Sequence, residues 1–245
     1  MAFSLVTRVG MKDEVRDQIV SLCGLINIEP QEAIEIGNRL HDTSGLVARK
    51  GRFFYVTPQI VAQAAFDMAW THWLRDDPES FLRQIPSAII PSFLERVKGI
   101  PSPQIRQIVS GFFSQSFQFT PQDLQSSESV ARLVNIVLAD PAAHLPLLNS
   151  LINNSTIEEL RGNKGHYSRG GWGPRRKLVW LLEDLAAFPE YFALSEDSLL
   201  RLAVAESEPS IANNATGIWS RLFRIRLSGT AVPFFERLDL SQSHS

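Results

Sequence analysis

Hydrophobic spacing in the first part of the chain predicts two helices. Apolar side chains recur at three and four residues over residues 14–23, and again over residues 27–42. Pro30 falls near the expected start of the second helix, where the missing N–H of proline removes no intrahelical hydrogen bond. One face of this second helix is expected to hold Ala33, Ile34, Gly37 and Leu40.

Two short stretches of strand-forming residues follow these helices. Residues 46–49 and 53–56 flank Lys50-Gly51, a pair suited to a tight turn, so this segment predicts a β-hairpin. Two helices followed by a hairpin are the element order of a winged helix. We therefore predict a winged-helix-like module over residues 1–76.

Helical spacing dominates the rest of the chain. Pro58 opens a long segment that we expect to form a mostly buried helix, with an inward face of Ile60, Ala64, Met68 and Trp73. From Asp77 onwards, segments with apolar residues at three and four are each cut off by proline or glycine, and Asp77-Pro78 and Asp140-Pro141 resemble two equivalent helix starts. Helices joined by short turns predict an α-helical bundle or irregular solenoid over residues 77–245. The expected fold class is mainly α.

A basic, glycine-rich stretch interrupts this pattern at residues 161–177, RGNKGHYSRGGWGPRRK. It holds six basic residues, five glycines and no acidic residue, so it cannot itself be core. Pro174 suits the first turn of a helix, and this placement puts three cations where the helix dipole disfavours them. Either the cations pair with acidic neighbours such as Glu158 and Glu159, or they contact an external anion or acidic surface. The residues expected to contact a partner are Lys164, Arg169, Trp172, Arg175, Arg176 and Lys177.

Two amphipathic helices are predicted beyond this stretch. The first has one apolar face, flanked by Trp180, that consists of Leu178, Leu181, Leu182 and Leu185. The second begins at Asn213 or Asn214, ends at Ser228-Gly229, and is expected to turn four residues inward: Ile218, Trp219, Leu222 and Ile225.

The basic stretch does not match a phosphate-binding loop. Gly165 and Gly170 have the glycine spacing of a P-loop, but Gly171-Trp172 stands where the lysine and the hydroxyl residue are needed. The preceding segment is also helical, whereas a P-loop follows a strand. Nucleotide hydrolysis is therefore not expected from this chain.

Charge argues against nucleic-acid binding as the first choice. Residues 1–76 contain eight basic and nine acidic side chains, so the predicted winged helix lacks the net positive charge that drives DNA affinity. The local positive cluster at the hairpin tip consists of Arg49, Lys50 and Arg52. These three residues are the candidate nucleic-acid contacts in the alternative function, a nucleic-acid-binding winged-helix regulator.

No catalytic, metal-binding or cofactor-binding pattern emerges from the sequence. No nucleophile or dinucleotide motif is found. The five histidines do not approach metal-ligand spacing with one another or with Cys23; they are His41, His72, His144, His166 and His244. We expect Cys23 to be a buried structural thiol, since it lies in an apolar phrase. The chain is expected not to be an enzyme and to need no cofactor.

Composition fits a globular protein. The 245 residues are 44% hydrophobic and carry 24 basic and 26 acidic side chains, which leaves a net charge of -2 and no global attraction to nucleic acid or anionic membrane. A single cysteine excludes an internal disulfide and is typical of a reducing compartment. With no secretory pattern at the start and no apolar run long enough to span a bilayer, we expect a cytoplasmic protein without a membrane partner.

Five phrases resemble the segment that follows the nucleotide-binding module in large bacterial STAND-type P-loop ATPases. The phrases are VTRVGMKDEV, RFFYVTPQIVAQAAF, GGWGPRRKLVWLLEDLA, FPEYF and ESEPSIANNATGIWSRLFRIRLSGTAVPFFERL, and the resemblance that they carry extends over most of the chain. In that family a winged helix passes the nucleotide state to a helical sensor region that binds a partner or trigger. The resemblance implies signalling or defence in the cytoplasm. This sequence lacks the Walker A and Walker B motifs, so no residue of the ATP site is carried over.

The sequence therefore predicts a non-catalytic regulatory or sensor segment that binds a protein partner. A P-loop ATPase module is one candidate for that partner, as the resemblance implies. The alternative remains nucleic-acid binding through the hairpin tip and the central basic stretch.

Overall fold

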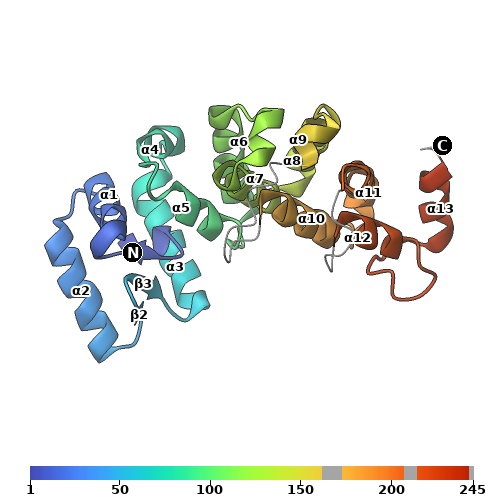
Figure 1. The fold of residues 1–245 in the computed structure, drawn as a ribbon. Coiled ribbons are helices and arrows are strands. Elements are labelled where there is room, and N and C mark those ends of the chain that lie inside the picture. The colour runs from blue at the N-terminus through green and yellow to red at the C-terminus, as the bar shows by residue number, and fades with distance from the viewer. Residues whose placement is uncertain (162–172, 207–213, 243–245) are drawn as a thin grey trace. The chain divides into compact units, whose positions relative to one another are not determined.

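The computed structural model describes residues 1–161, 173–206 and 214–242, and the chain divides into two compact units, Met1–Phe113 and Ser114–Ser245 (Figure 1). The described residues form thirteen α-helices and one small sheet, which confirms the mainly α fold class. The boundary predicted after residue 76 falls inside unit 1. The domain boundary after residue 76 therefore stays a prediction.

Unit 1 begins with short elements around a small sheet and continues in helices. Its elements in chain order are η1 (Ala2–Leu5), β1 (Val9–Gly10), η2 (Asp13–Val15), α1 (Asp17–Leu25), α2 (Pro30–Thr43), β2 (Val47–Lys50), β3 (Phe53–Val56), α3 (Gln59–Ala69), η3 (Trp70–Leu74), α4 (Pro78–Gln84), α5 (Ile90–Val97) and α6 (Pro103–Phe117). Helix α6 runs across the division between the units.

The sheet of unit 1 has three antiparallel strands in the order β1-β3-β2. The predicted hairpin is confirmed, with Gly51 at a φ of 61° in its turn, a conformation that glycine adopts without steric cost. Strand β1 was not predicted, because two residues are too few to show alternation. The small sheet does not by itself identify a winged helix, so the winged-helix module stays a prediction.

The buried face of α2 explains one glycine in the sequence. Ala33 and Gly37 are buried, as predicted, and the backbone at Gly37 lies against Phe54 of β3. A β-carbon built at Gly37 would lie 2.9 Å from a ring carbon of Phe54. Phe54 is itself buried and packs at 5.5 Å, between ring centroids, from Phe3. Glycine is therefore required for the helix to approach the sheet.

The predicted inward face of α3 is wrong. Ile60 is 72% exposed, and Ala64 and Met68 are exposed as well. The helix instead buries Ala62, Phe66 and Ala69. Apolar residues lie around most of the helix, so both the face with Ile60 and the face with Phe66 satisfy helical spacing. The face with the large Phe66 side chain is the one that fills the core. Phe66 packs against Phe93 of α5.

Unit 2 consists of helices around one hydrophobic core. Its elements after α6 are η4 (Pro121–Gln125), α7 (Ser127–Ala139), α8 (Pro141–Asn153), α9 (Ile157–Arg161), α10 (Pro174–Leu185), α11 (Pro189–Val204), α12 (Ala215–Leu222) and α13 (Phe234–Gln242). Helix α11 packs against α8, α10 and α12, and α7 packs against α8 and α10. The predicted apolar face of α10 is confirmed, since all four of its leucines are buried.

The helix starts that the sequence predicts at Asp77, Asp140 and Asn214 are capped in the structure. The carboxylate of Asp77 accepts from the backbone N–H of Ser80 at 3.0 Å, and that of Asp140 accepts from Ala143 at 3.4 Å, each with proline at the first helical position. The Asn214 side chain likewise accepts from the N–H of Gly217 at 2.8 Å at the start of α12. These contacts satisfy backbone donors that have no partner within the helix.

Helix α12 ends earlier than predicted, which overturns the inward placement of Ile225. The helix stops at Leu222, and Ile225 is 77% exposed. A guanidinium nitrogen of Arg237 donates to the carbonyls of Leu222 and Arg224, so it satisfies acceptors that another helical turn would have used. Ile218 is buried, as predicted.

Candidate functional site

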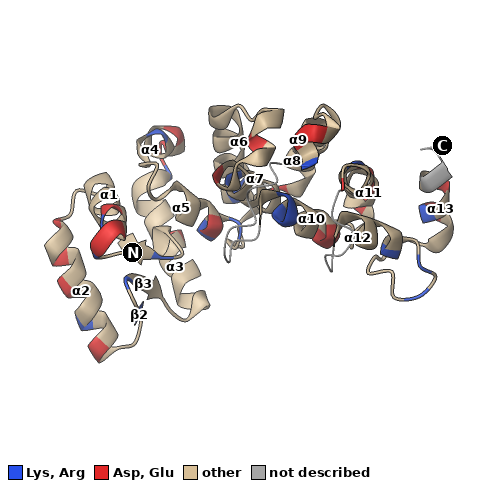
Figure 2. Ribbon diagram, in the orientation of Figure 1, with Lys and Arg blue, Asp and Glu red and all other residues tan. Residues whose placement is uncertain are grey.

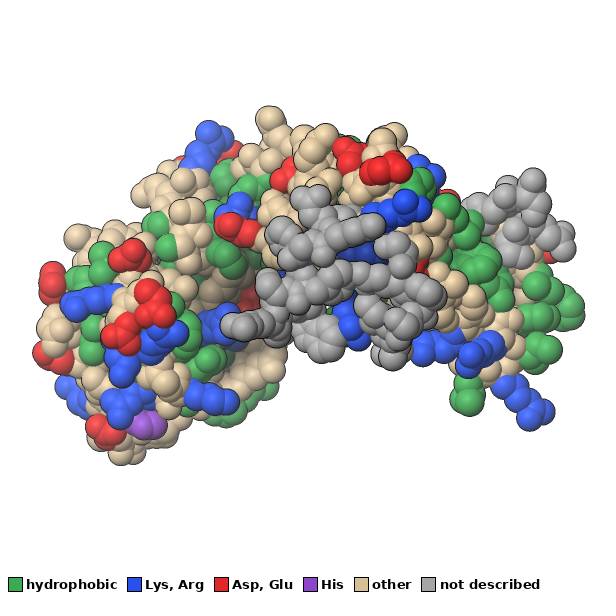
Figure 3. Space-filling view, in the orientation of Figure 1, with side chains coloured by type: hydrophobic (Ala, Val, Ile, Leu, Met, Phe, Trp, Pro, Cys, Tyr) green, Lys and Arg blue, Asp and Glu red, His purple; other side chains and the backbone are tan. Residues whose placement is uncertain are grey.

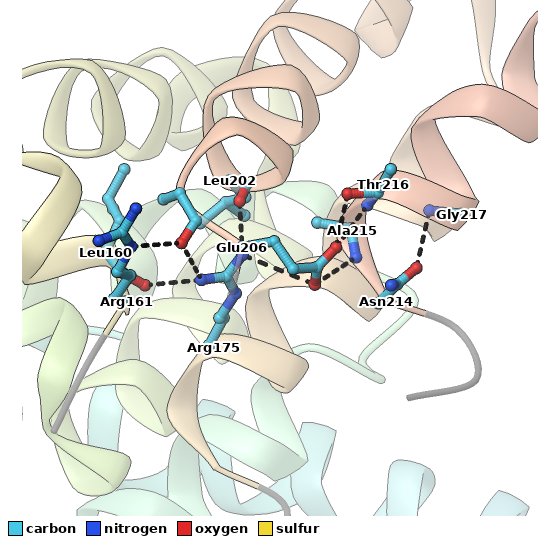
Figure 4. A network of polar contacts seen from close by, with 10 residues as sticks. Leu160, Arg161, Arg175, Leu202, Glu206, Asn214, Ala215, Thr216 and Gly217 are labelled. Carbon is cyan, nitrogen blue, oxygen red and sulfur yellow. Dashed lines mark hydrogen bonds and ion pairs between the residues drawn. The ribbon is translucent and has the colours of Figure 1, made fainter. Parts of the chain in front are cut away.

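The side chain of Arg175, the first basic residue of α10, points into unit 2 rather than towards solvent. Arg175 follows Pro174 at the start of the helix, and its side chain is only 22% exposed. Its Nη1 donates to the carbonyl of Leu160 at 3.0 Å, and its Nη2 donates to the carbonyl of Leu202 (Figure 4). These carbonyls belong to the C-terminal turns of α9 and α11, where acceptors lack helical partners. Arg175 therefore joins three helices.

Glu206 completes this cluster and extends it to α12. Its carboxylate lies 3.7 Å from Nη2 of Arg175, and it accepts from the N–H of Ala215 at 3.2 Å and from the N–H of Thr216 at 3.0 Å. Burial lowers the pKa of the Arg175 guanidinium, and the Glu206 charge opposes that shift. The negative charge also lies at the N-terminus of α12, where the helix dipole favours it.

These contacts give Arg175 an internal role. The acidic neighbours named from sequence are not its partners: it pairs with Glu206, and Glu159 accepts from the N–H of Thr156 at 2.8 Å. Sequence distance hid the pairing, because Glu206 lies far along the chain from Arg175. No local pattern signals such a contact.

The other predicted partner-contact residues divide into two groups. Arg176 lies with its guanidinium carbon 5.1 Å from the ring centroid of Trp180, and Lys177 is partly exposed in the same helical turn. Figure 2 shows basic residues in blue at the start of α10. Lys164, Arg169 and Trp172 lie outside the described residues. The partner contacts assigned to these five residues stay predictions.

The positive cluster at the hairpin tip is partly engaged in internal contacts. Arg52 forms an ion pair with Glu14, and hydrogen bonding from Arg52 lowers the pKa of that carboxyl. Arg49 donates to the side-chain oxygen of Asn38 at 3.1 Å, and Lys50 is exposed. The three cations lie together, as their sequence positions require, but one is neutralised by a carboxylate. Nucleic-acid contact by these residues stays a prediction.

A different surface of unit 2 exposes large apolar side chains. Leu227 is 91% exposed, Ile225 is 77% exposed, and Phe235 at the start of α13 is 78% exposed. These three residues lie between positions 225 and 235 of the sequence, and we call them the apolar cluster. Arg224 and Arg226 are exposed in the same segment between α12 and α13, where Figure 3 shows hydrophobic and basic side chains together on the surface.

The segment that carries the apolar cluster is anchored to the rest of unit 2. The N–H of Ala231 donates to the carbonyl of Ala187 at 3.0 Å, and Val232 is buried in the core. Arg237 is buried and binds the carbonyl of Arg224 at 3.0 Å. The exposed residues are therefore presented from fixed backbone, on both sides of buried anchors.

Leu227 combines exposure with an unfavourable backbone conformation. Its φ is 56°, in the left-handed region that a leucine seldom adopts, at a cost of about 1–3 kcal/mol. Neither the exposure of the side chain nor this conformation is favourable in the isolated chain. An exposed residue in a strained conformation makes this segment a candidate binding surface. The exposure of Leu227 and Phe235 has little trace in the sequence beyond the alternation of arginine and apolar residues before Ser228-Gly229.

Within the described ranges, no group of three His, Cys, Asp or Glu side chains lies close enough to hold a metal ion. Cys23 is a buried free thiol, as predicted, and burial raises its pKa. No helix in these same ranges combines the length and the apolar character needed to cross a bilayer.

Comparison with protein-family models, curated proteins and solved structures gives no match for this chain.

Proposed function

We propose that the chain is a protein-binding regulatory or sensor segment, and that the apolar cluster of unit 2 is its contact surface. The observation that carries this proposal is the exposure of Ile225, Leu227 and Phe235 on an anchored segment. Large apolar side chains that are exposed on an anchored segment are candidates for a protein interaction site. Scattered ones need no explanation.

The magnitudes are sufficient for specific binding. Burying a leucine, isoleucine or phenylalanine side chain contributes about 1.5–3 kcal/mol, so three such residues supply an energetic centre for an interface. Arg224 and Arg226 flank that centre and favour an acidic rim on the partner. The partner is expected to carry an apolar pocket bordered by carboxylates.

The hairpin offers weaker support for nucleic-acid binding. Of its three cations, Arg52 is ion-paired with Glu14 and Arg49 is engaged with Asn38. A groove contact by Lys50 and Arg49 would have to compete with the acidic residues of the same unit. Protein binding is therefore preferred.

The proposal includes the architecture implied by the family resemblance. Unit 1 would contain a winged helix built from α1, α2 and the β2–β3 hairpin, and the helices that follow would form the sensor region of a cytoplasmic signalling or defence protein. The mainly helical fold supports this proposal, and a P-loop ATPase module remains a candidate partner.

Photo-crosslinking in the native host tests the proposal. A photoreactive amino acid at position 227 should give a covalent adduct with a defined protein, and the same residue at position 60 serves as control because Ile60 is similarly exposed in unit 1. An adduct found from position 227 and absent from position 60 supports the surface. Adducts that are equal at both positions, or no adduct at 227, would contradict it, and a self-adduct would show that the surface joins two copies of this chain.

A further inference from the structure

Unit 1 contains a cavity that the partner surface does not use. It has a volume of about 410 Å³ and lies between the end of β3, the start of α3 and the C-terminal end of α5. This volume is within the range of small-molecule sites. The residues of its wall that matter chemically are Thr7, Tyr55, Val56, Glu95, Arg96 and Lys98.

Arg96 is the unusual residue of this wall. It is only 8% exposed, and its Nε and Nη2 both donate to the carbonyl of Val6, at 3.3 and 3.0 Å. Within the described part of the chain it forms no ion pair, and its Nη1 makes no hydrogen bond to protein. Burial lowers the pKa of this guanidinium and the charge of the neighbouring Glu95 opposes that shift, although Glu95 does not form an ion pair with it; an arginine remains charged at neutral pH. A buried cation without a carboxylate partner is costly unless an anion approaches it.

The neighbouring charges leave the cavity positive. Lys98 adds a second cation to the wall and is partly exposed. The single carboxylate of the wall, Glu95, is exposed and accepts from the hydroxyl of Thr7 at 2.8 Å. Two cations and one engaged carboxylate favour an oxyanion ligand and disfavour a metal ion, which would need several oxygen donors.

The remaining wall combines the polar residues Thr57 and Gln59 with an apolar surface. Tyr55 and Val56, at the end of β3, are partly buried beside the cavity. We propose that this cavity binds a small organic anion, with its carboxylate or phosphate group at Arg96 and Lys98 and its apolar body against Tyr55 and Val56. This site is independent of the apolar cluster in unit 2, so either proposal can fail alone.

Amide chemical-shift titration of the full chain tests this site with four probes. Phenyl phosphate and benzoate carry both an anionic and an apolar part, whereas inorganic phosphate lacks the apolar part and benzyl alcohol lacks the charge. Ionic strength is matched with sodium chloride. We expect saturable shifts around the cavity with at least one of the first two probes, and weaker binding of inorganic phosphate and benzyl alcohol.

Two matched variants locate the contact. Lys98→Ala should weaken binding by about tenfold, because it removes one charge-assisted contact while leaving the buried wall in place. Lys12→Ala, at an exposed lysine of the same unit, should bind as the wild type does. The proposal is overturned if neither phenyl phosphate nor benzoate gives saturable shifts, if benzyl alcohol binds as tightly as they do, or if the two lysine variants lose affinity equally. Arg96→Gln, checked for wild-type folding by its amide spectrum, should weaken binding at least as much as Lys98→Ala.

Discussion

Replacing Arg175 with alanine should destabilise unit 2, although this residue lies in a stretch that reads as solvent-exposed in the sequence. The substitution removes the donors to the carbonyls of Leu160, Leu202 and Ala205. It also removes the cation 3.7 Å from Glu206. Each hydrogen bond from a charged donor contributes about 1.5–3 kcal/mol when fully buried.

The net loss is smaller than the sum of these bonds. The Arg175 side chain is 22% exposed, so water reaches part of the cluster and replaces some of the lost donors. Glu206 also keeps its backbone donors from Ala215 and Thr216. We expect a decrease of about 2–3 kcal/mol in the free energy of unfolding, which lowers the Tm by about 8–12 °C for a unit of this size.

Denaturant unfolding followed by circular dichroism measures this effect. Lys177→Ala is the matched control, since Lys177 is in the same helical turn and makes no hydrogen bond or ion pair with any described residue. Removing a cation near a helix N-terminus should leave stability unchanged or raise it by up to about 0.5 kcal/mol. Arg175→Lys should fall between the wild type and the alanine variant, because lysine keeps the charge and loses the planar set of donors. If Arg175→Ala unfolds within about 0.5 kcal/mol of the wild type, the internal role assigned to Arg175 is wrong.

Three further predictions concern the core. Gly37→Ala should cost about 1–3 kcal/mol of stability in thermal unfolding, because its β-carbon would lie 2.9 Å from the buried ring of Phe54; wild-type stability would refute the close packing. Trp219→Phe should cost about 1–3 kcal/mol, since the indole N–H donates at 2.6 Å to the buried carboxylate of Glu196, and an unchanged denaturation midpoint would show that this bond is not formed. Burial lowers the pKa of His144 below its ordinary value, and the charge of Asp140, one helical turn earlier, opposes that shift. Unfolding therefore takes up a proton below about pH 6.5, so stability should fall as the pH decreases through that value, and His144→Gln should flatten this dependence in unfolding titrations at pH 5–8.

Signals that act over a few residues were sufficient for several helix starts. Asp140 could be placed as a cap from its sequence, because proline after it and a free N–H three residues on are both local requirements. The hairpin followed from Gly51 for the same reason. These features do not depend on what the rest of the chain does.

Features that depend on distant contacts could not be predicted. The buried face of α3 was misassigned because Ile60 and Phe66 both lie on apolar faces, and only the position of Phe93 decides between them. The end of α12 depends on Arg237, which lies beyond the next loop. Neither contact can be recognised from the few residues around each helix.

The candidate surface shows the same limit. Ile225 was expected on the inward face of a longer helix, and the structure exposes it because that helix ends at Leu222. Arg175 belongs to the basic stretch whose composition predicts an exposed contact, yet its side chain is turned into unit 2. The exposed apolar residues Ile225 and Leu227 lie in another phrase, for which the sequence predicts an inward-facing helix.

The affinity of the protein captured at position 227 tests the central claim most directly. The double variant Ile225→Ser and Leu227→Ser should weaken its binding by at least about 100-fold, since each lost side chain contributes about 1.5–3 kcal/mol to the interface. Both side chains are exposed, so the unfolding midpoint should stay within experimental error of the wild type. Ile60→Ser should leave the affinity unchanged. Equal affinity of the double variant and the wild type for that protein would contradict the account.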